Sequence, residues 1–285
     1  MLILQDALSH LEICPELGGA IANWRLRGSG LPLLRHSDAA ALAAGTPRRL
    51  GCFPLVPWSN RIGAGGFANP NGWLALTANS DDPLPIHGSA WQQPWQVVAH
   101  DEQRAELLLQ SSVPFAYRAR QVLELNDGCL SIALEVTHCG EQPAWYGLGL
   151  HPYFPRTAGT RLQAAAEAVW LCDEQRLSRE LAPLPAGWDF ACARELPAER
   201  VDHAFVGWNG RAVIHQPDLG YRLDCLASHC GHYLLFTPPE QGFFCLEPVS
   251  HPVNAHHLPG RPGLRLLARG ETARLRWSMS CWLLR

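Results

Sequence analysis

The segment VLELNDGCLSIALEV, residues 122–136, decides the class of fold. Apolar side chains stand at every second position from Leu130 to Val136, which is the period of a β-strand with one buried face. Another apolar run precedes them at residues 122–125, and the Asn-Asp-Gly sequence between the two runs is a typical turn. We therefore predict a β-hairpin over these residues.

Short apolar segments of the same kind recur along the chain, at residues 22–26, 107–109, 233–236, 243–246 and 275–277. The 25 glycines and 23 prolines leave little room for helices, and we expect at most brief helices near residues 39–44 or 173–179. Many short strands separated by turn residues predict an all-β fold, a large antiparallel β-sandwich with little helix. No linker or break in composition divides the chain, so we expect one domain over residues 1–285.

Charge and composition exclude several classes of function. The formal net charge is −3 and no basic block is present, which argues against nucleic acid as a partner. All 23 residues counted as lysine plus arginine are arginine. A chain without lysine cannot form a lysine Schiff base, anchor pyridoxal phosphate through lysine or build a P-loop.

The ten cysteines show no metal or redox motif, because no two of them have C-x-x-C spacing. The first ten residues lack the charged region and the sustained apolar stretch of a signal peptide, and no apolar run is long enough to cross a bilayer. We therefore expect reduced thiols in a soluble, cytoplasmic protein that has no membrane partner.

Five segments differ from ordinary strands and turns. They are GCFPLVPWSNRI at 51–62, IHG at 86–88 with Trp91 and Trp95 after it, GLGLHPYFPR at 147–156, VDHAF at 201–205 and CLEPVSHPVNAHH at 245–257. Taken singly, each has a structural explanation. A histidine beside a proline is usually a hydrogen-bonded loop residue, and a glutamate before a proline usually ends a strand in solvent. Only the ordered set points to a function.

In this order, the segments resemble the aldose 1-epimerase (galactose mutarotase) family. The family's F-P-x-x-P…N-R-I segment is similar to residues 53–62, its H-G to residues 87–88 and its G-x-x-x-H-P-Y-F to residues 147–154. Its Leu-Pro-x-Gly stretch, its acidic residue before an aromatic strand and its E-P-x-x-x-P-x-N-A motif are similar to residues 184–187, 202–205 and 247–255. The resemblance extends from about residue 12 to the C-terminus.

The resemblance implies a galactose mutarotase-like supersandwich and the interconversion of α and β sugar anomers by ring opening and closing. It implies that Glu247 is the base at the anomeric hydroxyl and His151 the acid at the ring oxygen, with His87 hydrogen-bonding near that oxygen. A carboxylate and a histidine suit this chemistry, because histidine exchanges a proton near neutral pH. The residues expected to bind the sugar are Arg61, Asp202 and Asn60, with Trp91 and Tyr153 as candidates for stacking on the pyranose.

The same resemblance implies no cofactor and no metal, with a small-molecule sugar as the partner. We expect a monomer or a homodimer. Two departures leave the identity of the sugar open. Leu150 stands where galactose-active members often have asparagine, and HGSAWQQPW at 87–95 lacks the second glycine and the arginine of the family form.

Three other hypotheses stay open. A β-sandwich that only binds sugar would keep the sugar-binding residues but would not need an acid together with a base. A metal-dependent enzyme could use His251, His256 and His257, although the last two are adjacent and point to opposite faces of an extended chain. An epimerase for a hexose 6-phosphate or an acidic sugar could bind the anion through Arg48-Arg49.

Overall fold

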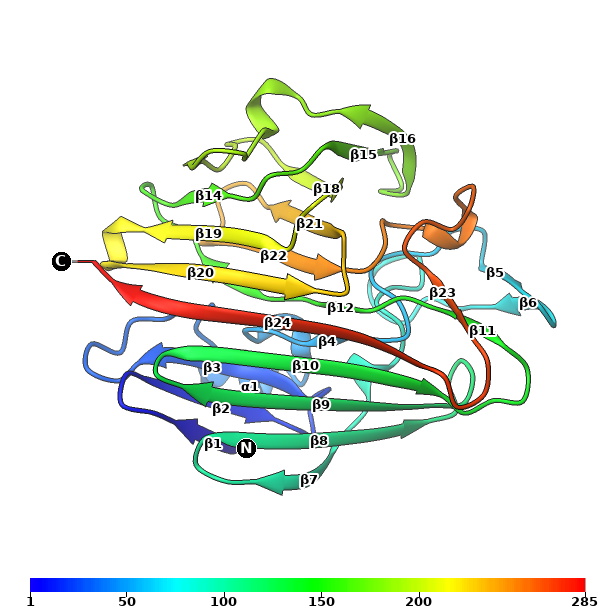
Figure 1. The fold of residues 1–285 in the computed structure, drawn as a ribbon, viewed down its shortest axis with the longest axis horizontal. Helices are drawn as coiled ribbons and strands as arrows, with labels where there is room; N and C mark the ends of the chain where they lie inside the picture. Colours follow the sequence, from blue (N-terminus) through cyan, green and yellow to red (C-terminus); the bar gives the residue numbers. More distant parts are fainter. Residues whose placement is uncertain (285) are drawn as a thin grey trace.

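The structure of the protein is a computed structural model that describes residues 1–284. Its strands form antiparallel ladders, and the two largest sheets pack against each other (Figure 1). The described residues hold 24 strands, one short α-helix and five 3₁₀ helices. The predicted all-β sandwich with little helix is therefore confirmed.

The predicted hairpin lies near the centre of the first sheet. Strands β9 (Tyr117–Asn126) and β10 (Cys129–His138) pair with Asn126 opposite Cys129, which leaves Asp127 and Gly128 as a two-residue loop. Both loop residues have positive φ, 50° and 72°, as a type I′ turn requires. Every second residue of β10 is buried, so the sheet has the alternation that the sequence predicted.

The first sheet has nine strands drawn from distant parts of the chain. From edge to edge they are β17 (Arg194–Glu195), β14 (Arg161–Gln163), β19 (Arg211–Gln216), β20 (Tyr221–Ser228), β24 (Thr272–Leu283), β10, β9, β8 (Arg104–Ser111) and β7 (Gln96–His100). The long β24, red in Figure 1, joins the hairpin to β20.

The second sheet has eight strands, and its central strands are buried on both faces. Its strands are β16 (Ser178–Pro183), β15 (Ala168–Cys172), β18 (Val201–Val206), β21 (His232–Thr237), β22 (Phe243–Val249), β12 (Gly149–Leu150) and β4 (Pro54–Leu55), with β13 (Tyr153–Pro155) also paired to β22. In β22, Phe244 and Leu246 belong to the main core, whereas Cys245 packs with Phe53 and Trp91 on the opposite face.

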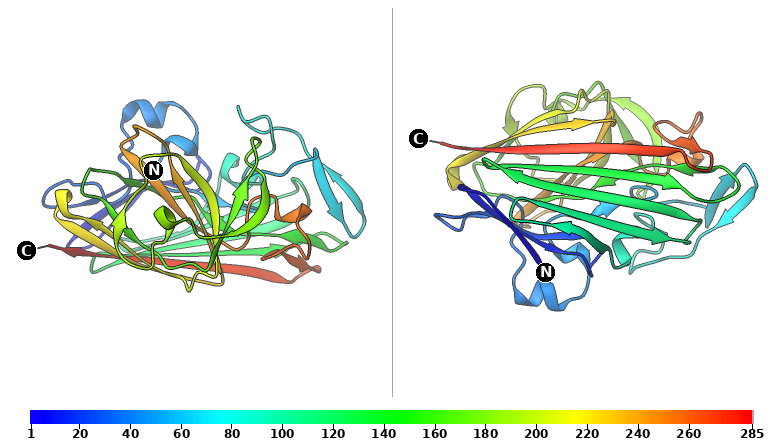
Figure 2. Two further views of the ribbon diagram at one scale, coloured as in Figure 1. Left: turned by 90° about the horizontal axis from the view of Figure 1, so that it is seen from above. Right: turned by 60° about the horizontal axis from the view of Figure 1, so that its bottom comes forward.

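Large aromatic side chains fill the space between the two sheets. Phe154 of β13 meets Trp277 of β24 edge to face, with ring centroids 6.1 Å apart, and both residues are at most 1% exposed. Figure 2 shows the first sheet along one side of the molecule and the short helix α1 (Ala39–Ala43) on the opposite side. The face of the second sheet that points away from the first sheet is therefore the one available for a site.

Smaller elements complete the structure. They are a sheet of β1 (Leu2–Gln5), β2 (Ser9–Cys14) and β3 (Ala20–Leu26), the pairs β5 (Gly66–Asn69) with β6 (Gly72–Ala75) and β11 (Ala144–Tyr146) with β23 (Arg265–Leu267), and 3₁₀ helices at Pro47–Arg49, Ala90–Gln92, Ala186–Trp188, Pro217–Leu219 and Ala255–His257. Helix α1 confirms the brief helix expected near residues 39–44. None of the helices within residues 1–284 has the length and apolar character that crossing a bilayer requires.

The other brief helix, expected near residues 173–179, does not form. Strand β15 ends at Cys172 and β16 begins at Ser178, and the chain turns between them. The Asp173 carboxylate accepts a hydrogen bond of 3.0 Å from the amide of Leu177, and Arg176 has a φ of 61°. A residue in this left-handed conformation interrupts a right-handed helix, so the segment is a strand connection.

Candidate active site

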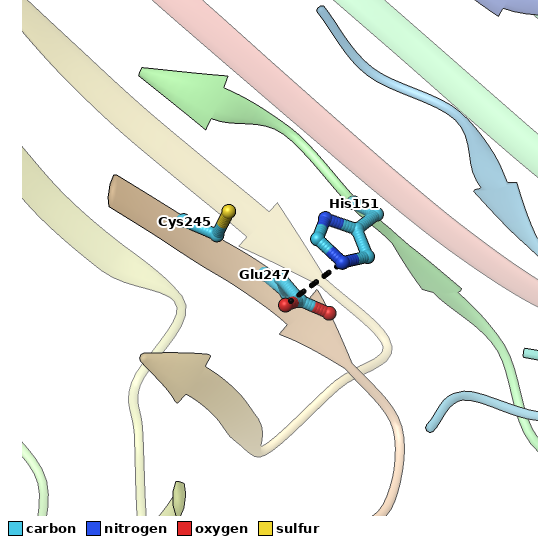
Figure 3. Close-up of side chains that lie close together, drawn as sticks. All are labelled: His151, Cys245 and Glu247. Atoms are coloured by element: carbon cyan, nitrogen blue, oxygen red, sulfur yellow. Dashed lines mark ion pairs between the residues drawn. The ribbon is translucent and has the colours of Figure 1, made fainter. Parts of the chain in front are cut away.

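His151 and Glu247 face each other across neighbouring strands of the second sheet. Tyr153 lies opposite Cys245 in the β13–β22 ladder, and β12 continues the same register, so His151 falls opposite Glu247. His151 Nε2 is 3.4 Å from Glu247 Oε1 (Figure 3). The structure thus brings together the two residues that the sequence predicted as acid and base.

Both side chains of this pair are almost completely buried, with His151 7% and Glu247 1% exposed. Burial disfavours charge, so it raises the pKa of Glu247 well above its usual value and lowers the pKa of His151 to about 3. The charge of Asp202 raises the pKa of Glu247 further, whereas Arg61 lowers it. The raised pKa of Glu247 and the lowered pKa of His151 favour a pair in which the carboxyl group and the imidazole share one proton at neutral pH.

A stack of planar groups fixes the orientation of the His151 ring. The rings of Phe53 and Tyr153 both stack on it, with centroid distances of 4.8 and 4.6 Å. The Arg35 guanidinium continues the stack, 3.7 Å above the Tyr153 ring. The backbone amide of His151 also donates a hydrogen bond of 2.9 Å to the Phe53 carbonyl. The imidazole therefore cannot turn from Glu247 without disturbing its neighbours.

Two loops, residues 53–62 and 86–91, pack over this face of the sheet. Isolated bridges join Val56 to Gly88 and Arg61 to Ile86. Gly88 has a φ of 66°, and a β-carbon there would lie 2.2 Å from the Val56 carbonyl oxygen. Only glycine lets the two loops approach so closely.

Reciprocal hydrogen bonds hold His87 against Asn60. The amide of His87 donates to the Asn60 carbonyl and the amide of Asn60 donates to His87 Nδ1, both at 3.0 Å. Burial, then the nearby His151 and Arg61, lower the pKa of His87 well below its usual value, so the ring is neutral at neutral pH. A neutral ring that accepts at Nδ1 carries its proton at Nε2, which makes His87 a hydrogen-bond donor beside His151.

Arg61 is held by Asp82, a residue that the sequence did not single out. Arg61 Nε and Nη2 both lie 2.8 Å from Asp82 Oδ2, and the two side chains are 9% and 11% exposed. Asn60 Oδ1 accepts hydrogen bonds from the amide and from Nη1 of Arg61, at 2.8 and 3.1 Å. The Asn60 side chain, which was predicted to bind sugar, therefore uses its oxygen to orient Arg61.

Asp202 lies at the edge of the same sheet face. It is in register with Phe236 of β21, which is in register with Cys245, so the three side chains form one row across the sheet. Its Oδ2 is 3.2 Å from Arg200 Nη2 and 3.9 Å from Arg176 Nε. The structure places this predicted sugar ligand near Glu247 and between two arginines.

The two aromatic residues predicted to stack on a sugar have other contacts. His151 stacks on Tyr153 with ring centroids 4.6 Å apart, and the Arg35 guanidinium lies 3.7 Å from the centre of the same ring. Trp91 is 3% exposed, and its indole N–H donates to the carbonyls of Ile86 and Gly88 at 3.3 and 3.2 Å. Both rings pack around the catalytic candidates and also line a cavity, so their stacking on a sugar stays a prediction.

Similarity to known proteins identifies the family of this chain. The family model described as Aldose 1-epimerase matches residues 4–280. The chain belongs to the aldose 1-epimerase family. It is 35% identical over 292 residues to the uncharacterized protein YphB of Escherichia coli (strain K12), covering 97% of this chain and 98% of that protein. The predicted resemblance is confirmed.

Solved structures agree with this membership of the aldose 1-epimerase family. A crystal structure from Escherichia coli K12, provisionally assigned as an aldose 1-epimerase, is 33% identical with a TM-score of 0.92 over 99% of both chains. A GalM/aldose epimerase homologue from C. elegans has a TM-score of 0.83 over 100% of this chain and 99% of that one. At 14% identity, that second likeness concerns the fold alone.

Two cavities of the protein lie near the His151–Glu247 pair. The larger, about 740 Å³, is lined by Tyr153, which stacks on His151. The smaller, about 370 Å³, is lined by Arg61. Arg48 and Asp81 form an ion pair and line both cavities. The catalytic candidates lie behind the first layer of lining residues.

His151, Cys245 and Glu247 could together hold a metal ion. Each offers one ligand atom, and these atoms lie within 4.8 Å of one another. Figure 3 shows that Cys245 and Glu247 project from β22 on the side that faces His151. Imidazole, thiolate and carboxylate are the ligand types that zinc takes in proteins.

The histidine set considered from the sequence, His251, His256 and His257, does not form a comparable ligand cluster. His251 Nδ1 donates to the Pro252 carbonyl at 2.7 Å, and its Nε2 accepts from the Ser59 amide at 3.1 Å. His257 Nε2 is instead 2.7 Å from the carbonyl of Gly66. These contacts give the histidines a structural role in positioning the residue 53–62 loop and β5.

Sequence reasoning missed Asp82, Cys245 and Arg35. One signal was available for Cys245, because a residue two positions before Glu247 on a strand shares its face. No sequence pattern links Arg35 to Tyr153 or Asp82 to Arg61, since both contacts arise from the packing of loops.

Proposed function

We propose that the protein interconverts the α and β anomers of an aldose by acid–base opening and closing of the sugar ring. The observation that carries the proposal is the buried pair of His151 and Glu247, with Nε2 and Oε1 3.4 Å apart. Membership of the aldose 1-epimerase family supports the same reaction type.

The reaction uses the single proton of the pair. Transfer of that proton from the carboxyl group to the imidazole gives a carboxylate and an imidazolium, and the nearby Arg61 favours the carboxylate. The Glu247 carboxylate removes the proton of the anomeric hydroxyl while His151 gives its proton to the ring oxygen. The bond between C1 and the ring oxygen breaks with its electrons on that oxygen, and C1 becomes an aldehyde. Rotation about the C1–C2 bond and the reverse steps produce the other anomer.

The surrounding side chains suit the charges that form in this reaction. His87, with its proton at Nε2, donates a hydrogen bond near the ring oxygen, where negative charge develops. Arg61, fixed by Asp82, and Asp202 offer a donor and an acceptor for sugar hydroxyls. No cofactor enters these steps.

A sandwich that only binds sugar is the less favoured alternative. Such a protein would not need a carboxyl group buried opposite an imidazole, because burying ionisable groups reduces folding stability unless they are paired. The pair is explained by proton transfer and not by hydroxyl recognition alone.

Nuclear magnetic resonance exchange spectroscopy on glucose, galactose and related aldoses tests the proposal. We expect anomer exchange far above the uncatalysed rate for at least one sugar. If no sugar of the panel, neutral or anionic, exchanges faster with the protein than without it, the proposal is wrong.

A further inference from the structure

Arg200 comes directly before β18, where the ladder between β18 and β21 fixes the backbone on both sides of it. The amide of Val201 donates a hydrogen bond of 2.9 Å to Thr237 Oγ1, and the same hydroxyl donates to the carbonyl of Glu199 at 3.2 Å. Thr237 itself is completely buried. The sheet therefore sets the direction in which the Arg200 side chain leaves the backbone.

The Arg200 side chain contacts two residues on the face of the second sheet that carries Glu247. Arg200 and Asp202 are two positions apart on an extended chain, so their side chains lie on the same face. Arg200 Nη2 donates to Asp202 Oδ2 at 3.2 Å, and the guanidinium carbon lies 5.0 Å from the ring centre of Phe236. Phe236 is the partner of Asp202 in the ladder, so one guanidinium group holds both members of this pair.

Asp202 opposes the ionisation of Glu247. Burial is the main cause that raises the pKa of the Glu247 carboxyl group, and the negative charge of Asp202 is the next, whereas Arg61 acts in the other direction. Glu247 shares one proton with His151. The remaining titratable groups around it are uncharged at neutral pH, because burial lowers the pKa of the histidine and raises that of the thiols and the phenol: His87, Cys52, Cys245 and Tyr153.

The contacts of Asp202 leave one of its oxygens free. Arg200 at 3.2 Å and Arg176 at 3.9 Å both approach Oδ2. Within residues 1–284 the Asp202 side chain makes no other hydrogen bond or ion pair, so Oδ1 is available to a sugar hydroxyl. Since the side chain is only 13% exposed, water screens its charge incompletely, and the arginines are the groups that offset it.

We propose that Arg200 is a positioning residue of the reaction, which holds Asp202 in place and offsets its negative charge so that Glu247 can act as a base. This inference rests on the proposed function and adds a residue that acts through Asp202, because Arg200 is not among the residues that line the two cavities near the site within residues 1–284. Without the guanidinium group, the Asp202 carboxylate would repel the Glu247 carboxylate. The proton that His151 and Glu247 share would then stay on Glu247, where it prevents catalysis.

Removal of Arg200 should change the charge of the site more than the stability of the fold. Its side chain is 39% exposed, and ion pairs of such residues contribute little to stability. Arg200→Gln removes the charge and keeps most of the side-chain length. Arg200→Lys keeps the charge and is the conservative variant.

The test measures anomer exchange against pH with a sugar that the unmodified protein accepts. Arg200→Gln should lower the rate at neutral pH by about three- to tenfold and move both limbs of the pH–rate profile to higher pH, because a more negative environment raises both apparent pKa values of the acid–base pair. Arg200→Lys should keep a profile close to that of the unmodified protein. A loss of rate without movement of the profile, or an equal movement in the lysine variant, overturns the proposal.

Arg222→Gln is the matched control. Arg222 also pairs with an acid two positions further along its strand, Asp224 at 3.2 Å, and its side chain is 44% exposed. It lies on β20 of the first sheet, away from the candidate site. Its rate and profile should not change. A profile that moves as far as that of Arg200→Gln would assign the effect to net charge and contradict the proposal.

A titration of the Glu247 carboxyl resonance in isotope-labelled protein needs no sugar. The resonance is identified by its loss in Glu247→Gln. Arg200→Gln should move its titration midpoint to higher pH, whereas the same change added to Asp202→Asn should not move it, since the arginine acts through Asp202. An unmoved midpoint in the single variant, or an equal movement in both backgrounds, overturns the role of Arg200. If no sugar exchanges faster with the protein than without it, the proposed function fails, and this titration still decides whether Arg200 controls the ionisation of Glu247.

Discussion

The amide of Asn60 donates a hydrogen bond of 3.0 Å to Nδ1 of His87, and this contact places the histidine proton on Nε2. One backbone group therefore decides which atom of the ring can act on a sugar. The same contact holds the residue 53–62 and 86–91 loops together. The contribution of His87 to protein stability and its contribution to activity can thus be separated by substitution.

His87→Asn should keep the fold and lose rate. The Asn Oδ1 can accept from the Asn60 amide in place of Nδ1, and asparagine tolerates the φ of 63° at this position. The donor at Nε2 is lost, so we expect the exchange rate to fall about 100-fold while the free energy of unfolding changes by less than about 1 kcal/mol. Urea unfolding and exchange spectroscopy measure the two effects. A variant with the full rate would show that His87 does not act on the sugar.

Glu247→Gln and His151→Asn should each lower the exchange rate by about 10²–10⁴-fold. Polarimetry on freshly dissolved sugar measures this loss, and rates near those of the unmodified protein would contradict the assignment of acid and base.

Glu247→Gln should also change how stability depends on pH. The pKa of Glu247 in the folded protein lies above its ordinary value of 4.5, so the unfolded chain loses that proton first and stability falls as the pH rises above 4.5. The glutamine variant should therefore unfold at higher urea concentration than the unmodified protein at pH 8.

Zinc ions should inhibit the protein in competition with sugar. Their ligands would be His151, Cys245 and Glu247, whose ligand atoms lie within 4.8 Å of one another. Burial raises the pKa of the Cys245 thiol, so zinc binding must release a proton and inhibition should strengthen as the pH rises. Chelation by EDTA should restore the rate.

The cysteine contribution to zinc inhibition has a matched control on the surface. Cys245→Ser should weaken inhibition by more than about tenfold, because serine is a poor ligand for zinc. Cys192→Ser changes an exposed thiol and should have no effect. Equal inhibition constants for the two variants would place the metal elsewhere.

Gly88→Ala should destabilise the protein more than Gly30→Ala does. Both glycines have positive φ, 66° and 72°, but an added β-carbon would lie 2.2 Å from the Val56 carbonyl oxygen at Gly88 and within 4 Å of nothing at Gly30. Backbone strain alone costs about 1 kcal/mol, and the additional clash should bring the loss at Gly88 to about 3 kcal/mol or more. Thermal unfolding of both variants checks this, and equal losses would mean that the loop approach is not tight.

Acid should weaken the fold through buried histidines near the site. The pKa of His251 is lowered by burial from 6.5 to about 4, so between these values the unfolded chain binds a proton that the folded protein does not. Stability should therefore fall as the pH decreases from 6.5 to 4, and His232, also lowered to about 4, adds to the loss. His251→Gln keeps an acceptor for the Ser59 amide but does not titrate. Urea unfolding at pH 6.5 and at pH 4 should show a smaller loss of stability for this variant than for the unmodified protein. An equal loss would contradict the assignment of His251 as a titrating group.

Local features of the fold could be predicted from the sequence, and non-local ones could not. The hairpin at residues 122–136 follows from alternation and one turn sequence, and both are properties of neighbouring residues. The expected helix near residues 173–179 was wrong because the Asp173 side chain binds the Leu177 amide and stabilises a turn. Pattern matching of this kind does not detect a capping contact that favours a competing local structure.

The residues of the candidate site also include some that the sequence indicates and some that it does not. Resemblance to a family named His151 and Glu247, but only the ladder between β13 and β22 explains why they meet. The partners Asp82 and Arg35 come from loops whose sequences have no periodicity. Their positions depend on how the loops pack on the second sheet, and this packing leaves no mark in the local sequence.

Strand β22 has a consequence for how the protein can be assayed. Its residues alternate between the core, with Phe244 and Leu246, and the candidate site, with Cys245 and Glu247. A slip of one residue in its pairing would bury the carboxylate in the core and turn leucine toward the site. A misregistered chain therefore cannot persist as a folded but inactive molecule. If Glu247 is the catalytic base, the fraction of a preparation that is catalytically competent should equal the fraction that is folded.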